Sequence, residues 1–335
     1  MRNSCTISVW LVLLLVLTSL SIQGAHAKDP SPTSREYKLM LKPEIFNGTD
    51  PLPAIQTLWN MSFQPILDTT LDLHSDGKPR YHGSFHLDKE RIVRFWDTPA
   101  PRPCLLKRHG YIFRERVRIE EGNKKTREVT LKFRSADQYL AATKEMIAKN
   151  DKAETKFEED IGQVIVQVFD EFGVLHRYTD SNPSFKSVYS HSTTHPFGEN
   201  KTPNTIKDVL NLYPGLSDGL KEESAKVNKD ETIVPVSDME VYEKVYTGPI
   251  MDLGKLDATF SLTLWYLKND QAATHPMIAE ISFKYELPNG ENTFPRKVAK
   301  RAKDVFDTMQ TLPAIDPTSS TKTAAVYDHA NFCGS

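Results

Sequence analysis

Positive charge recurs at every second position in two adjacent segments of the chain. Arg114, Arg116 and Arg118 follow this spacing, and Lys132 and Arg134 repeat it after a polar turn. Because residues two apart on a β-strand lie on one face, the segments predict neighbouring strands that share a face of five cations. Like charges opposite each other destabilise a sheet. The pattern therefore predicts a β-rich fold in which this face meets something anionic.

The positive charge is local to this part of the sequence. Residues 102–134 contain eleven Lys and Arg against four Glu, whereas the whole chain of 335 residues has 42 Lys and Arg against 44 Asp and Glu. A local excess in a chain of balanced charge favours a pocket over a broad nucleic-acid surface. We therefore expect a small anionic partner and no nucleic acid.

The N-terminus has the pattern of a secretory signal peptide. Arg2 precedes an apolar stretch over residues 7–22, and Ala25-His26-Ala27 resembles a cleavage site. We expect cleavage after Ala27, export to a periplasm or to the outside of the cell, and no stable membrane span afterwards. The alternative is an uncleaved anchor, although about 16 apolar residues are few for a span.

Two cysteines remain after residues 1–27 are removed. In an oxidising compartment, Cys104 and Cys333 are a candidate disulfide that would tie the C-terminus to the edge of the basic region. Spacing alone leaves open whether the two thiols lie close enough to pair.

Periodicity divides the remainder into strands, helices and loops. Expected strands cover residues 34–41, 90–96, the basic hairpin and 156–160, and strands resume from Ile233, most clearly at 259–267 and 277–286. Expected helices cover residues 135–149, 161–172, 204–212 and 295–312. Residues 47–90 read as hairpins and loops, 180–203 as a loop, and 180–230 have no assigned role.

Several of the expected strands have one apolar and one charged face. In residues 129–134, Val129, Leu131 and Phe133 alternate with Thr130, Lys132 and Arg134. Two arrangements explain this alternation: a sheet whose polar face meets water, or a closed barrel with a charged interior and helices on an apolar exterior. Acidic positions on other strands favour an interior that holds both signs of charge. No P-loop, dinucleotide fingerprint, G-x-S-x-G or H-E-x-x-H motif is present.

Six segments, in order, resemble the CYTH or triphosphate tunnel metalloenzyme family. They are Ser34–Lys38 (SREYK), Asp97–Pro99 (DTP), Arg108–Arg116 (RHGYIFRER), Thr130–Arg134 (TLKFR), Lys156–Asp160 (KFEED) and Glu280–Ser282 (EIS). The resemblance spans about residues 34 to 310. It implies an α+β fold, namely a closed antiparallel eight-stranded β-barrel, or tunnel, with helices packed outside. The expected domain is residues 28–312, followed by a polar tail over 313–335.

The resemblance also implies roles for individual residues. The phosphate-binding residues would be Lys38, Arg114, Arg116, Lys132, Arg134 and Lys156. Glu36 and Glu158 would be catalytic, and Glu158, Asp160 and Glu280 would bind Mg²⁺ or Mn²⁺. Glu115 falls on the opposite strand face and is excluded from the site.

The expected function is that of a secreted metal-dependent phosphohydrolase acting on a phosphoanhydride of a triphosphate or polyphosphate. Ser34 and Ser282 stand where the family motifs carry acids, and fewer carboxylates hold a divalent cation less strongly. The alternative is therefore a non-catalytic binder of phosphate-like anions with a degenerate metal site.

Overall fold

The computed structural model describes residues 31–119, 125–169, 175–179, 184–198, 201–222, 227–267, 274–316 and 321–334. The expected signal peptide lies outside these residues, so it stays a prediction. Among the residues that are described, no helix is long and apolar enough to cross a membrane.

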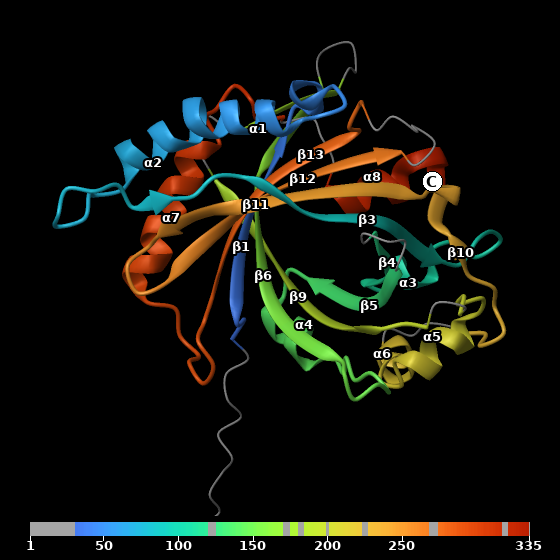
Figure 1. The fold of residues 1–335 in the computed structure, drawn as a ribbon. Coiled ribbons are helices and arrows are strands. Elements are labelled where there is room, and N and C mark those ends of the chain that lie inside the picture. The colour runs from blue at the N-terminus through green and yellow to red at the C-terminus, as the bar shows by residue number, and fades with distance from the viewer. Residues whose placement is uncertain are drawn as a thin grey trace, which may run out of the picture.

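Nine strands form a closed ring in the described part of the chain (Figure 1). Their order around the ring is β3 (His86–Asp97), β4 (Tyr111–Ile119), β5 (Lys125–Ser135), β9 (Phe185–Pro196), β6 (Glu154–Gln163), β1 (Ser34–Leu41), β13 (Ile278–Glu286), β12 (Asp257–Leu267) and β11 (Val241–Asp252). The ring closes where β11 pairs with β3 along Val241–Thr247. The short strand β2 (Tyr81–His82) pairs with β11, and the short strand β10 (Val234–Pro235) pairs with β3. Strands β7 (Ile165–Phe169) and β8 (Leu175–Thr179) form a separate pair.

The barrel differs from the expected one in strand number and in direction. The family resemblance implied eight antiparallel strands, whereas the described ring has nine, and β1 runs parallel to β6. The additional strand is β9, which lies between β5 and β6 in a segment predicted as loop. Its Ser and Thr residues suggested a loop, but Ser190, Ser192 and Thr194 are short side chains that fit the barrel interior. Composition was therefore a poor guide to this strand.

Two further predictions were wrong. Residues 161–172 were predicted as a helix, but β6 continues to Gln163 and β7 follows, since Ile and Val are β-branched and favour strands. Residues 47–90 were predicted as hairpins and loops, but most of the first half is helical. The expected helix over 135–149 is reduced to α4 (Gln138–Thr143).

Other expected elements are present close to their predicted bounds. The strand over residues 34–41 is confirmed at both ends, and those over 90–96, 259–267 and 277–286 correspond to β3, β12 and β13. The basic hairpin is β4 and β5, and the helices over 204–212 and 295–312 are α5 (Ile206–Leu212) and α7 (Arg296–Met309). These segments have clear periodicity and recognisable ends.

The helices cover the outside of the barrel. Besides α4, α5 and α7, the described helical segments are η1 (Pro43–Phe46), α1 (Leu52–Leu58), the π-helical η2 (Trp59–Phe63), α2 (Gln64–Thr70), α3 (Leu105–Arg108), α6 (Leu216–Glu222), η4 (Val236–Asp238), α8 (Lys322–Asp328) and η5 (His329–Asn331). One cluster packs α1, α2 and α7 against the outer faces of β1, β12 and β13, and a second packs α5 and α6 against β4 and β5. The barrel exterior is therefore apolar, which leaves its interior for polar side chains.

The C-terminal segment packs against the barrel. Val326 and Tyr327 of α8 lie in a third apolar cluster with Phe95 and Trp265. The candidate disulfide is confirmed, because Cys104 and Cys333 are bonded, with their Cα atoms 5.4 Å apart. As a result, α8 contributes to the interior of the barrel although it falls in the expected polar tail.

Candidate functional site

A cavity of about 820 Å³ occupies the barrel interior, a volume within the range typical of ligand pockets. Of the ten residues predicted for the site, nine line it: Glu36, Lys38, Arg114, Arg116, Lys132, Arg134, Lys156, Glu158 and Asp160. Strand alternation and pairing bring them together, since Glu36 pairs with Asp160 and Arg116 pairs with Glu128 across neighbouring strands. Their positions agree with the prediction, while their roles stay predictions.

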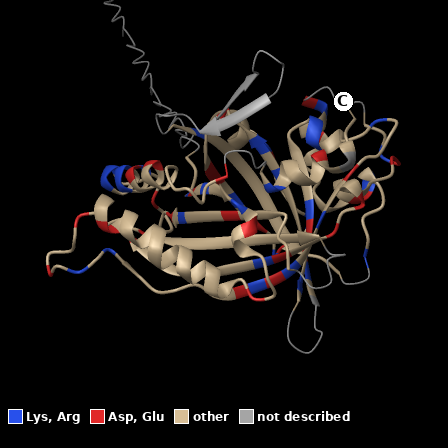
Figure 2. Ribbon diagram, turned by 90° about the horizontal axis from the view of Figure 1, so that it is seen from above, with Lys and Arg blue, Asp and Glu red and all other residues tan. Residues whose placement is uncertain are grey.

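The charges of the cavity wall are of both signs. Within the described residues, the lining contains eight Lys and Arg and six Asp and Glu, an excess of two cations. Figure 2 shows basic and acidic segments along the barrel strands. Of the two arrangements left open by the sequence, the structure has the closed barrel with a charged interior.

The arginines of β4 and β5 form the less compensated wall. Arg114 makes no hydrogen bond or ion pair with any described residue, and its buried Nε has no partner. Burial lowers the pKa of Arg114 well below its ordinary value, and Arg116 lowers it further, while the carboxylate of Glu243 only partly opposes the shift. Because a guanidinium remains charged in proteins, this shift signals electrostatic strain that an anion would relieve.

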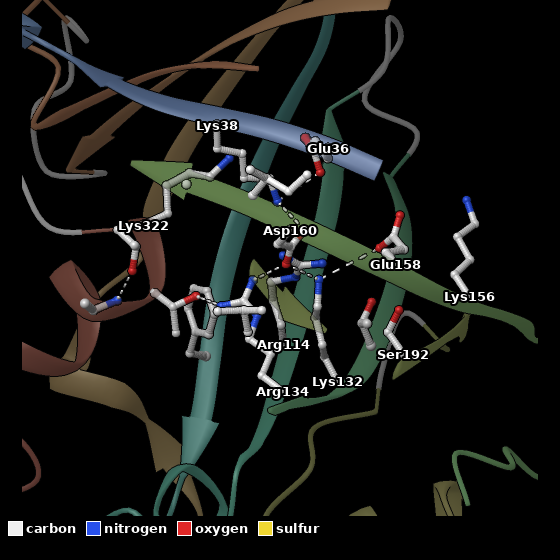
Figure 3. Close-up of a pocket in the computed structure, with 18 of the residues that line it drawn as sticks. Glu36, Lys38, Arg114, Lys132, Arg134, Lys156, Glu158, Asp160, Ser192 and Lys322 are labelled. Atoms are coloured by element: carbon white, nitrogen blue, oxygen red, sulfur yellow. Dashed lines mark hydrogen bonds and ion pairs between the residues drawn. The ribbon is translucent and has the colours of Figure 1, made fainter. Parts of the chain in front are cut away.

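Arg116 and Arg134 each lie near one carboxylate, but at a longer distance than in a close ion pair. Arg116 lies 3.6 Å from Glu128, and Arg134 lies 3.6 Å from Asp160 and donates to Thr323 at 3.3 Å. The buried Nε atoms of Arg116 and Arg134 have no hydrogen-bond partner. Figure 3 shows Arg114, Lys132 and Arg134 extending from the hairpin toward Asp160. Three arginines thus hold donor groups ready for a ligand inside one cavity.

Carboxylates line the part of the wall formed by β1 and β6. Burial alone would raise the pKa of Glu158, but Lys132 and Lys284 lower it to about 2. The pKa of Asp160 is likewise lowered, since Lys132 and Lys38 outweigh the effect of burial. Both carboxylates are therefore ionised near neutral pH.

Glu280 is the predicted site residue that lies apart from this lining. Its side chain is buried in β13, and its Oε1 forms an ion pair with Lys322 Nζ at 2.8 Å. Lys322 itself lines the cavity, so this ion pair connects Glu280 to the cavity wall. The excluded Glu115 is confirmed outside the cavity, where it accepts from Trp96 and Arg127.

Sequence reasoning missed several residues in or beside the cavity. Glu243, Trp265 and Lys322 line it, and Lys284 contacts Glu158 from β13 at 2.7 Å. Glu243 is fully enclosed, where it pairs with Arg91 and accepts from Trp265 Nε1 at 2.8 Å. Glu243 is two residues from Val241 and from Val245, so an acid on an otherwise apolar strand face was a usable signal in the sequence. Nothing in the sequence near Lys322 indicated that it lines the cavity.

The predicted metal ligands do not form a metal site as their side chains lie. In the described ranges, no group of three or more His, Cys, Asp or Glu side chains is arranged to hold a metal ion. Glu36, Glu158 and Asp160 instead contact lysine ammonium groups. We therefore assign no chemical step to Mg²⁺ or Mn²⁺.

Comparisons with known proteins give structural matches at low identity. No protein-family model and no curated protein matches the chain. A Hippeastrum protein described as a candidate adenylyl cyclase with a dominant triphosphatase activity matches with 13% identity and a TM-score of 0.37, over 87% of this chain and 93% of the other. PH1819 from Pyrococcus horikoshii OT3 matches with 11% identity and a TM-score of 0.30, over 85% and 94%. The Mimivirus capping enzyme triphosphatase matches with 9% identity and a TM-score of 0.30, over 83% and 90%. Because these identities and TM-scores are low, the barrel is defined by the strand order of this chain and not by the matches.

Proposed function

We propose that the barrel binds a small anion with several phosphate groups, of which inorganic tripolyphosphate is the simplest. The observation that supports this most directly is Arg114, a guanidinium inside the cavity that makes no hydrogen bond or ion pair with a described residue. An arginine fork donates two parallel hydrogen bonds to phosphate oxygens, which accounts for arginine rather than lysine at this position.

Calorimetric titration of tripolyphosphate into the full chain tests this proposal. Arg114→Met should weaken binding at least tenfold, since it removes a cation whose guanidinium has no hydrogen bond or ion pair with a described residue. Lys300→Met is the matched control, because Lys300 is an exposed residue of α7 outside the barrel and its loss changes net charge equally. Equal binding by wild type and Arg114→Met would contradict the proposed site.

Hydrolysis of a terminal phosphoanhydride is the second candidate. It is favoured by Glu36 and Asp160, which line the same cavity as the arginines and could orient a water molecule toward a bound phosphate. The test is phosphate release from tripolyphosphate, with and without Mg²⁺ or Mn²⁺, with Lys132→Ala as the inactive control. Binding that needs Lys132 without any release would leave the anion-binding function and reject the hydrolase.

We also propose that residues 1–27 direct export. The disulfide between Cys104 and Cys333 supports this, because such bonds persist in oxidising compartments. Mass spectrometry of the protein recovered from the medium or periplasm of its host would test it, with Lys28 expected as the first residue.

A further inference from the structure

Each carboxylate on the β1 and β6 wall has a lysine as its counter-ion. Lys38 Nζ lies 2.9 Å from Glu36 and 2.8 Å from Asp160. Lys284 Nζ lies 2.7 Å from Glu158. Lys132 Nζ lies 3.3 Å from Asp160 and 3.8 Å from Glu158. Three ammonium groups therefore balance three carboxylates.

Strand pairing fixes this arrangement. Glu36 on β1 pairs with Asp160 on the parallel strand β6 and with Lys284 on the antiparallel strand β13. The register thus places Lys284 beside the carboxylates from the opposite side to Lys132, which comes from β5. Lysines from three strands converge on the acids.

Hydroxyl groups occupy further acceptor sites of these carboxylates. Ser34 Oγ donates to Glu158 Oε1 at 3.2 Å, and the buried Ser190 Oγ donates to Asp160 Oδ2 at 2.8 Å. A divalent cation would have to displace ammonium groups and hydroxyl donors to reach these oxygens. Separating such enclosed ion pairs is costly, because an unpaired charge then remains in a poorly hydrated site.

We propose that Lys38, Lys132 and Lys284 take the electrostatic place of a divalent metal, so that the cavity binds polyphosphate without one. This inference rests on the proposed function and concerns the same site. With the carboxylates already neutralised, the arginines of β4 and β5 attract the anion without opposition from the acidic wall. Lys284 is the positioning residue of this arrangement, because it engages Glu158 and does not itself line the cavity.

The test compares tripolyphosphate binding with and without divalent metal. Metal is removed with a chelating resin, since a soluble chelator is itself a polyanion that competes for the cavity. Affinity is calculated for the free anion, because tripolyphosphate binds Mg²⁺ and Mn²⁺ in solution. The Kd of wild type for free tripolyphosphate should differ by no more than about threefold between the two buffers, which corresponds to roughly 0.6 kcal/mol. Binding that requires Mn²⁺ would overturn the inference but keep the proposed function, whereas no binding in either buffer would overturn both.

A second measurement follows free Mn²⁺ by electron paramagnetic resonance, without any phosphate ligand. Wild type should leave Mn²⁺ free at millimolar concentration, and Mn²⁺ binding at micromolar concentration would overturn the inference. Lys284→Met should lower tripolyphosphate affinity at least fivefold in metal-free buffer, and Mn²⁺ should restore part of it. Lys284→Met that binds like wild type in both buffers would refute the role of Lys284, and Lys300→Met controls for the change in net charge.

Discussion

Replacing Arg114 by methionine should stabilise the protein while weakening its binding of polyphosphate at least tenfold. Most substitutions inside a protein destabilise it, so the expected sign is unusual. It follows from the absence of any described partner for Arg114 and from the cations beside it. Methionine keeps an unbranched side chain of similar reach without the charge.

The magnitude follows from strand geometry. Arg114 and Arg116 occupy successive interior positions of β4, about 7 Å apart along the strand. At an effective dielectric constant of about 20, two unit charges at that separation repel by roughly 2.4 kcal/mol. Salt and partial hydration reduce this repulsion, so we expect a gain of about 1–2 kcal/mol in the free energy of unfolding. For a chain of this size, the melting temperature would rise by about 2–5 °C.

Thermal and urea unfolding, with and without tripolyphosphate, measure both parts of the prediction. At a ligand concentration of about 100 times the wild-type Kd, wild type should gain about 2.7 kcal/mol, whereas Arg114→Met, with at least tenfold weaker binding, should gain no more than about 1.4 kcal/mol. Lys132→Met is the matched comparison, since it also removes one cation from the lining. Lys132 lies 3.3 Å from Asp160, so its loss leaves carboxylate charge uncompensated and should cost about 1–3 kcal/mol.

The opposite signs of these two variants are the critical result. If Arg114→Met were less stable than wild type without ligand, Arg114 would make a stabilising ion pair in solution. The proposal that its guanidinium is available to bind an anion would then be refuted. If Arg114→Met kept the full ligand-induced stabilisation, the anion would bind elsewhere.

Three further predictions concern pH and packing. Burial lowers the pKa of Lys132 to about 8, although Asp160 opposes the shift, so tripolyphosphate affinity should fall several-fold as pH rises from 7 to 9 in calorimetric titrations, and Lys132→Arg should keep its affinity. Burial would raise the pKa of Glu158, yet Lys132 and Lys284 lower it from 4.5 to about 2, so its contribution to stability is present above pH 4.5 and is lost toward pH 2. In urea unfolding, Glu158→Gln should cost about 2–3 kcal/mol at pH 7 and little near pH 2. Gly219→Ala would bring a Cβ into steric overlap with Tyr111 Oη, so it should destabilise the protein by about 1–3 kcal/mol despite the higher helix propensity of alanine, again measured by urea unfolding.

The candidate site could be predicted because it depends on local alternation. Two residues on one strand share a face whatever the rest of the fold does, so Arg114, Arg116, Lys132 and Arg134 were correctly grouped. Their burial could not be derived from the same pattern, because a solvated face and a barrel interior alternate alike. The apolar exterior, which helices cover, distinguishes the two.

The remainder of the barrel depends on contacts between distant parts of the chain. Strand β9 separates β5 from β6, and its polar composition gave no sign of that position. Lys322 reaches the cavity because α8 packs against Phe95 and Trp265 and because Cys333 is bonded to Cys104. The presence of two cysteines indicated the bond, but the place of α8 required the tertiary structure.

The two parts of the cavity wall differ in how their charges are balanced, and this difference determines what the barrel can bind. Carboxylates on β1 and β6 are matched by lysines at 2.7–3.3 Å, so they neither attract a cation strongly nor repel an anion. The described lining has an excess of two cations, and its arginines on β4 and β5 have no ion pair with a described residue closer than 3.6 Å. A singly charged anion would leave part of this excess in place, whereas a multiply charged phosphate chain can neutralise it and accept from several guanidinium groups at once. Selectivity for polyphosphate over single phosphate should consequently come from the basic hairpin, with the acidic wall setting whether a metal is needed.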